Sequence, residues 1–167
     1  TLFFDYHRQH KLKIKVARIF NTYGPRMHPN DGRVVSNFII QALQNSDITI
    51  FGDGSFIRDY VFVEDVINSF LTAGLNMDTV GGKHYYIGSG IGHRLVDTVN
   101  FIADRVALKK GQRPIIEYAP PPIKFSAFDN RNFVSDTSNF NIDTGWLPNV
   151  PLEVGVDLTI NHFINNW

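Results

Sequence analysis

Residues 18–26, RIFNTYGPR, decide how the rest of the chain is interpreted. They leave an apolar segment, KIKVARIF (13–20), and enter a turn that carries an asparagine, a tyrosine and a Gly-Pro pair. The apolar segment has the composition of a buried strand, and ligand sites in open parallel sheets lie just beyond the carboxyl ends of their strands. The amide of Asn21 can donate and accept hydrogen bonds there, although an asparagine that only caps its own turn fits the pattern equally well.

Helix-like and strand-like segments alternate outward from this turn. Apolar periodicity predicts helices over 34–45, 64–76, 95–107 and 151–166, and residues 1–10 read as the end of a further helix. β-rich runs predict strands over 13–20, 83–90 and 113–120, and two more within 48–63, joined by a Gly-Asp-Gly-Ser hairpin or short turn. Consecutive prolines make 119–125 an extended loop. The alternation indicates an α/β fold.

The helical phase also predicts which side chains face the core. The expected inward-facing residues are Val35, Phe38, Ile39 and Leu43 in the helix over 34–45, Val66, Phe70 and Leu71 in the helix over 64–76, and Val154, Leu158 and Phe163 in the last helix.

Composition excludes several classes of protein. The chain has 167 residues, 43% hydrophobic and 19% charged, which is typical of one globular domain. Lysine plus arginine equal aspartate plus glutamate at 16 each, so nucleic acid and anionic membranes are not expected partners. There is no cysteine, the histidines lack metal-ligand spacing, and no apolar run reaches the roughly 18–20 residues that cross a bilayer. A cytoplasmic protein without a bound metal is expected.

Two further stretches offer groups that could bind an anion. NDGRVVSNF (30–38) places Arg33 at the start of a helix, where free N–H groups attract anions, and Asn37 follows one turn later. A solvated arginine on a polar helix face is the alternative. GDGSFIRDY (52–60) places Arg58 and Tyr60 on one side of a strand and Asp59 on the other. Arg58 is either part of a salt-bridged sheet edge or a phosphate-binding arginine.

These stretches together resemble a known family. ARIFNTYGPRMHPNDGRVVSNFIIQAL (17–43) followed by ITIFGDGSFIRDYVFVEDV (48–66) is similar to the C-terminal half of extended short-chain dehydrogenases/reductases that modify nucleotide sugars. HRQHK (7–11) and GPRMHPNDGRVVSNFI (24–39) resemble the UDP-glucuronate decarboxylase (UDP-xylose synthase) branch in particular. The resemblance implies the C-terminal part of a Rossmann-like fold with a smaller substrate-binding α/β subdomain. Residues 1–32 would end the Rossmann domain, and 33–167 would form mainly the subdomain, with some elements returning to the Rossmann sheet.

The resemblance also implies roles for individual residues. Ile19 and Phe20 match the strand beside the nicotinamide of NAD, the family cofactor. The implied substrate-binding residues are Asn21, Arg33 and Asn37, Thr49 and Phe51 beside the nucleobase, Arg58 on the diphosphate, and Arg131 as a second phosphate-binding arginine with imperfect spacing. Trp146 matches a segment that packs the final helix and is assigned to the core.

The departures from the family pattern are equally informative. Family members bind NAD through a G-x-x-G-x-x-G turn and use a Tyr-x-x-x-Lys pair as acid/base, and this chain has neither. The glycines of IGSGIGHR (87–94) do not reproduce that turn. The chain is therefore expected to be a fragment that starts just after the catalytic lysine, to hold no catalytic residue and to be inactive alone. A homodimer, formed through a helix bundle that includes residues 1–10, is expected for the full-length enzyme.

The expected activity of the whole enzyme is NAD-dependent decarboxylation of UDP-glucuronate to UDP-xylose through a 4-keto intermediate. A nucleotide-sugar 4-epimerase or 4,6-dehydratase shares the first step and remains an alternative. An alternative of another class is a nucleotide-sugar-binding module without chemistry.

Overall fold

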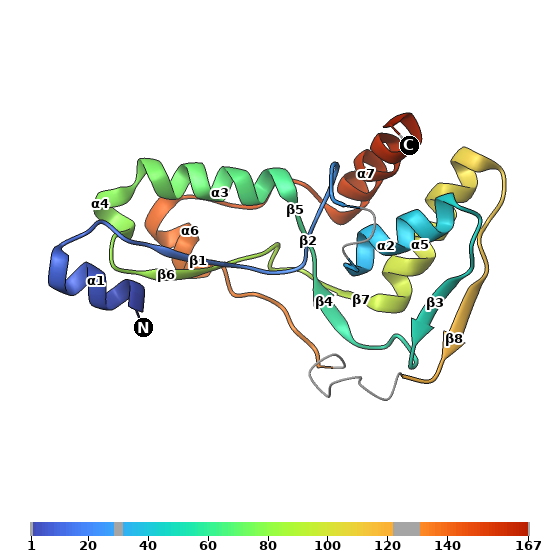
Figure 1. Ribbon diagram of the computed structural model, residues 1–167, viewed down its shortest axis with the longest axis horizontal. Coiled ribbons are helices and arrows are strands. Elements are labelled where there is room, and N and C mark those ends of the chain that lie inside the picture. Colours follow the sequence, from blue (N-terminus) through green and yellow to red (C-terminus); the bar gives the residue numbers. More distant parts are fainter. Residues whose placement is uncertain (1, 29–31, 122–130, 167) are drawn as a thin grey trace.

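The structure is a computed structural model that describes residues 2–28, 32–121 and 131–166 (Figure 1). The helices are α1 (Leu2–His10), α2 (Val34–Leu43), α3 (Val63–Leu75), α4 (Met77–Val80), α5 (Leu95–Lys110), α6 (Ser138–Thr144) and α7 (Leu152–Asn166). The strands are β1 (Val16–Ile19), β2 (Thr22–Tyr23), β3 (Ile48–Phe51), β4 (Ile57–Asp59), β5 (Val61–Phe62), β6 (His84–Ile87), β7 (Gly92–Arg94) and β8 (Ile116–Ala119). The expected extended loop over 119–125 lies mostly outside the described residues.

Strand pairing joins segments that lie far apart in the sequence. β1 pairs in parallel with β6, from Val16 opposite His84 to Ile19 opposite Ile87. β2 pairs in parallel with β5, and β3 pairs in parallel with β8. Only β4 and β7, among the described strands, pair antiparallel. Parallel neighbours need a crossover connection, and helices lie within these connections. The expected α/β class is confirmed.

The elements form two lobes (Figure 1). The β1–β6 lobe comprises α1, β1, α3, α4, β6 and α6, and its core gathers side chains from β5, α3, β6 and the α6 region: Val61, Val66, Ala73, Tyr85, Ile87, Phe140 and Trp146. Trp146 is 6% exposed, so its assignment to the core is confirmed. Buried side chains from β6 and from the region of α6 therefore share one core.

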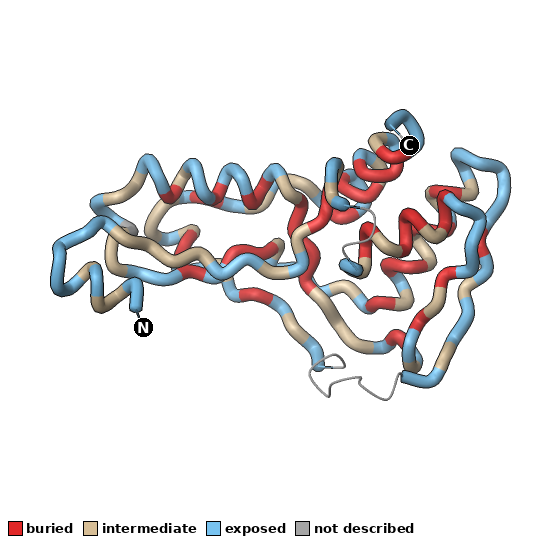
Figure 2. Tube along the Cα trace, viewed as in Figure 1, coloured by how far each residue is buried: buried red, intermediate tan, exposed pale blue. Residues whose placement is uncertain are grey.

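The α2–α5 lobe holds the larger core. It comprises α2, β3, β4, β7, α5, β8 and α7, and Figure 2 shows the buried sides of α2, α5 and α7 turned toward one another. Val35, Phe38, Ile39 and Leu43 are all buried in this core, which confirms the inward face predicted for α2. Arg105 of α5 forms an ion pair with Asp157 of α7, with Nε 2.6 Å from Oδ1. The rigid packing of α2 on α5 fixes the helix that begins at the candidate site.

The Gly-Asp-Gly-Ser segment forms a turn and not a hairpin. The runs on either side of it, β3 and β4, pair with β8 and β7 and not with each other. Asp53 stabilises the turn because its carboxylate accepts from the Ser55 backbone N–H at 3.0 Å. The sequence shows turn chemistry at this point but gives no sign of the distant partner strands.

Two predicted helix faces are wrong in part. In α3, Val66 is buried but Phe70 and Leu71 are 48% and 61% exposed. In α7, Phe163 is buried but Val154 and Leu158 are 50% and 43% exposed. In α7 the buried positions are instead Leu152, Gly155, Val156, Thr159, Ile160 and Phe163. Both helices carry apolar residues on more than one face, so the periodicity alone did not determine which face is buried.

Candidate functional site

Asn21 lies in a sharp bend between β1 and β2. Its φ is +39°, a left-handed conformation that asparagine adopts more readily than most residues. Its side-chain amide nitrogen donates to the backbone oxygen of Asp59 at 2.8 Å, and its own carbonyl accepts from the Val61 N–H at 3.3 Å. The bend is thus bound to the β4–β5 segment. The amide oxygen of Asn21 is the group that this arrangement leaves for a further contact.

Arg33 is the N-cap residue of α2, with extended backbone at φ −76° and ψ 140°. Its side chain makes no capping hydrogen bond, so the first N–H groups of α2 face the space beside Gly32 and Arg33. One guanidinium nitrogen lies 3.5 Å from the Thr22 carbonyl oxygen. Arg33 is therefore placed over the β1–β2 bend.

Arg58 projects from β4 and is held by several neighbours. Its guanidinium carbon lies 4.5 Å from the centre of the Phe56 ring, so the cation stacks on that aromatic face. One nitrogen donates to the carbonyl of Ile57 at 3.2 Å and also to the carbonyl of Arg131. A planar guanidinium placed in this way has the geometry to donate to a phosphate.

A cleft of about 530 Å³ brings most of the expected substrate residues together. Its described lining residues are Asn21, Gly32, Val34, Asn37, Phe38, Gln41, Thr49, Phe51, Phe56, Arg58 and Leu95. They come from the β1–β2 bend, α2, β3, β4 and the start of α5. Among these described residues Arg58 alone carries a charge, Asn21, Asn37, Gln41 and Thr49 add neutral polar groups, and the others are apolar or glycine. A mixture of apolar walls and convergent polar groups is typical of small-molecule sites.

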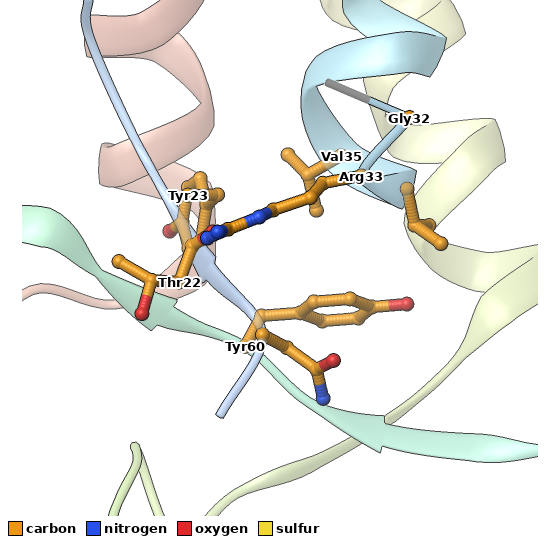
Figure 3. Close-up of a pocket in the computed structure, with 8 residues that line it drawn as sticks. Thr22, Tyr23, Gly32, Arg33, Val35 and Tyr60 are labelled. Atoms are coloured by element: carbon orange, nitrogen blue, oxygen red, sulfur yellow. The ribbon is translucent and has the colours of Figure 1, made fainter. Parts of the chain in front are cut away.

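A smaller pocket of about 150 Å³ adjoins the cleft. Its described lining residues are Asn21, Thr22, Tyr23, Gly32, Arg33, Val34, Val35 and Tyr60. Asn21, Gly32 and Val34 line both hollows, which places the pocket next to the cleft at the bend. Figure 3 shows the Arg33 side chain reaching toward Thr22 and the Tyr60 ring pointing into the same hollow. Arg33 therefore lines the smaller pocket and not the cleft.

Arg131 and the end of β1 lie apart from the lining of both hollows. The Arg131 guanidinium lies 5.8 Å from the centre of the Phe133 ring, and only its carbonyl contacts Arg58. Ile19 is 44% exposed at the end of β1, while Phe20 packs on Phe133 with ring centres 4.5 Å apart. The Ile19 side chain offers an apolar surface of the kind on which a nicotinamide ring packs.

The glycine-rich bend after β6 already binds a carboxylate of the protein. The Ser89 and Gly90 N–H groups donate to the Asp59 carboxylate at 2.8 and 3.1 Å. Because these donors are used, the bend is not arranged to bind the pyrophosphate of a dinucleotide. The NAD contact expected for Ile19 and Phe20 stays a prediction.

Gln41, Phe56 and Leu95 line the cleft but were not anticipated. Gln41 follows Asn37 by one turn of α2, so the i, i+4 spacing could have indicated it. Phe56 precedes Arg58 by two residues and lies on its side of the strand. Leu95 could not be found from local sequence, because the pairing of β7 with β4 brings α5 to the site.

Within the described part of the chain, no group of histidine, aspartate or glutamate side chains is arranged to hold a metal ion. None of the helices described is long and apolar enough to cross a membrane.

The fold is α/β with a cleft of small-molecule size, and comparison with known proteins specifies the family. The model of the NAD dependent epimerase/dehydratase family matches residues 1–88. UDP-glucuronic acid decarboxylase 1 of Danio rerio is 36% identical over 163 residues, which cover 98% of this chain and 36% of that protein. The chain therefore spans about a third of the length of this relative. It belongs to the NAD-dependent epimerase/dehydratase family.

Solved structures show the same fold. UDP-glucose 4-epimerase of Thermotoga maritima, solved with UDP-glucose, is 31% identical with a TM-score of 0.83, over 96% of this chain and 49% of that one. UDP-glucose 4-epimerase of Thermus thermophilus, solved in complex with NAD, is 28% identical with a TM-score of 0.80, over 98% and 50%. The expected fold class, the C-terminal part of a Rossmann-like extended short-chain dehydrogenase/reductase, is confirmed.

Proposed function

We propose that this chain is the nucleotide-sugar-binding portion of an NAD-dependent enzyme that converts UDP-glucuronate to UDP-xylose. The observation that carries this proposal is the single cleft lined by Asn21, Asn37, Thr49, Phe51 and Arg58. The similarity to UDP-glucuronic acid decarboxylases over 98% of the chain supports the choice of reaction. The α2–α5 lobe would bind the substrate, and the β1–β6 lobe would continue the Rossmann domain of the intact protein.

Different residues of the cleft would contact the nucleobase, the diphosphate and the sugar. Phe51 and Phe56 provide aromatic faces for the nucleobase, with Thr49 beside them. Arg58, fixed on Phe56, donates to the diphosphate. Asn21 then lies where the sugar would leave the cleft, and its amide oxygen accepts from a sugar hydroxyl.

This chain would contribute to the reaction by orienting the bound substrate. NAD, held in part against Ile19 and Phe20, supplies reversible hydride transfer when bound. In the proposed reaction the sugar C4 hydroxyl would be oxidised to a ketone, the resulting β-keto acid would lose CO2, and the ketone would then be reduced again. The described residues position C4 and exclude water from it, and the proton transfer belongs to a Tyr-x-x-x-Lys pair that this chain does not contain.

The test uses the intact protein that carries this chain. Incubation with NAD and UDP-glucuronate should release CO2 and form UDP-xylose. Arg58→Ala should raise KM about 10–100-fold, because a charge-assisted hydrogen bond contributes about 1.5–3 kcal/mol. Arg113→Ala is the matched control, since Arg113 pairs with Asp104 away from the cleft, and its KM should stay at the wild-type value.

Other products would change the assignment. Interconversion of UDP-sugars without CO2 would reject decarboxylation and support the 4-epimerase that the Thermotoga maritima neighbour represents. Water loss to a 4-keto-6-deoxy sugar would support a dehydratase. Binding of UDP-sugar without any turnover would support a binding module.

We also propose that the intact protein is a homodimer. The support is the apolar surface of α1, where Leu2, Phe3 and Tyr6 are 67%, 58% and 47% exposed. Sedimentation of the intact protein should give twice the monomer mass, and Phe3→Asp should shift it to the monomer.

A further inference from the structure

The smaller pocket contains hydroxyl groups that the protein leaves without a hydrogen bond. Among the described residues, the buried side-chain polar atoms with no partner are Thr22 Oγ1, Gln41 Oε1, the Tyr60 hydroxyl and Trp146 Nε1. Thr22 and Tyr60 line the pocket. A buried donor without a partner is unfavourable and is rare in folded proteins, so each instance asks for a physical reason.

Tyr60 is the stronger of the two cases. The residue is 4% exposed, and its ring points into the hollow beside Arg33 (Figure 3). Its backbone is held on both sides, since the Asp59 carbonyl accepts from Asn21 and the Val61 N–H donates to Asn21. These bonds fix the backbone from which the Tyr60 ring projects. Burial raises the pKa of the Tyr60 phenol above its ordinary value, so the hydroxyl keeps its proton at neutral pH.

Tyr23 provides a direct contrast within the same pocket. It is 1% exposed, and burial likewise raises the pKa of its phenol. Its hydroxyl, however, donates to the Leu152 carbonyl at 3.3 Å, and its ring packs edge-on against Phe62. Tyr23 is thus a satisfied core residue, whereas Tyr60 has equal burial and no such partner among the described residues.

The pocket has the size and chemistry for an oxygen-rich group. Its volume of about 150 Å³ equals about five water molecules at roughly 30 Å³ each, enough for a phosphate or one edge of a sugar. Arg33 supplies a positive charge and Asn21 an amide, and no carboxylate is among its described lining residues. The shared residues Asn21, Gly32 and Val34 let a ligand in the cleft continue into it.

We propose that Tyr60 is a substrate-contact residue whose hydroxyl donates to a phosphate or sugar oxygen of the nucleotide sugar in this pocket. The proposal rests on the proposed function, which it deepens by adding a donor beyond those of the cleft. A ligand oxygen would satisfy the hydroxyl only in the complex. Removal of the hydroxyl should therefore weaken binding without weakening the ligand-free fold.

The experiment compares Tyr60→Phe with Tyr85→Phe in the intact protein, because Tyr85 is a buried tyrosine that lines neither the pocket nor the cleft. Calorimetric titration with UDP-glucuronate should give a Kd about tenfold higher for Tyr60→Phe, while its ligand-free melting temperature stays level or rises. Tyr85→Phe should lower the melting temperature, because it removes the hydrogen bond that the hydroxyl donates to Asp143, and should keep the wild-type Kd. A parallel titration with UDP identifies the oxygen: equal weakening for both ligands indicates a phosphate, and weakening for UDP-glucuronate alone indicates the sugar.

Unchanged affinity of Tyr60→Phe for UDP-glucuronate would overturn the proposal, and a lower melting temperature with unchanged affinity would show a structural role only. Wild-type protein that binds neither UDP nor UDP-glucuronate would instead reject the proposed function, so the two failures give different results.

Discussion

At the residue scale, Asp59 accepts hydrogen bonds from several segments that surround the site. Its carboxylate is fully buried and accepts from the backbone N–H groups of Ser89, Gly90 and Ser135 at 2.8, 3.1 and 3.1 Å, and from the hydroxyls of Ser89 and Ser135. Its backbone carbonyl accepts from Asn21. One residue thereby joins β4, the bend after β6 and the segment before α6. Such a buried anion is favourable only because hydrogen bonds surround it.

Asp59→Asn tests this role. The amide keeps the shape of the side chain but replaces one acceptor oxygen with a donor that faces N–H and O–H groups, so the free energy of unfolding should fall by about 2–4 kcal/mol. Urea denaturation measures the change. Asp53→Asn is the control, because Asp53 is exposed in the turn before β4 and should change stability by less than about 1 kcal/mol. A smaller loss for Asp59→Asn than for Asp53→Asn would contradict the assigned role.

The sequence could predict such residues but not their partners. The alternation of side chains along a strand predicted that Asp59 and Arg58 face opposite sides of that strand. The sequence IGSG (87–90) indicated the glycine-rich bend. A salt-bridged edge was one interpretation of the Arg-Asp pair. The serine and glycine donors that Asp59 uses lie 30 or more positions away along the chain. Their convergence depends on the antiparallel pairing of β4 with β7, which sets Asp59 opposite Gly92, and on the bridge between Arg58 and Phe133. No local pattern encodes either contact.

At the element scale, α7 packs on the bend through a glycine. A Cβ at Gly155 would lie 2.8 Å from the Phe62 ring and would also meet the Tyr23 hydroxyl. The close approach of α7 to β2 and β5 therefore requires this glycine. This close contact also explains why the face of α7 that carries Gly155 is buried, whereas Val154 and Leu158 are exposed. Apolar periodicity had wrongly predicted that Val154 and Leu158 face the core.

Gly155→Ala and Gly74→Ala should change stability in opposite directions. Alanine favours a helix over glycine by about 1 kcal/mol, but overpacking at Gly155 costs about 1–3 kcal/mol, so that variant should be less stable. Gly74 lies exposed in α3, and a Cβ there meets no atom within 4 Å, so Gly74→Ala should stabilise by about 0.5–1 kcal/mol. Thermal unfolding of both variants gives the comparison. Stabilisation by Gly155→Ala would show that α7 can shift away from Tyr23 at little cost.

At the scale of the whole molecule, the sequence predicted the order of elements better than their assembly. Every helix and strand expected within the described residues is present, because each has its own hydrophobic periodicity and is bounded by residues that end helices or strands. The division into two lobes depends on which distant strands pair, and the apolar residues Phe70 and Leu71 of α3 have no covering surface among the described residues. In the enzyme proposed above, the Rossmann domain would supply such a surface.

The two lobes should respond differently to a nucleotide. UDP at about 100 times its Kd would stabilise the bound form by about 2.7 kcal/mol. The N-terminal turn of α2 and strand β3 border the cleft, so their amides should exchange hydrogen more slowly in the complex. Helix α1 lies at the opposite end of the molecule (Figure 1), and none of its residues lines the cleft or the smaller pocket, so its amides should exchange at an unchanged rate. Hydrogen exchange followed by mass spectrometry on the intact protein measures both. Protection of α1 without protection of α2 and β3 would place the nucleotide outside the cleft, since only groups that contact the ligand or unfold with it can gain protection from it.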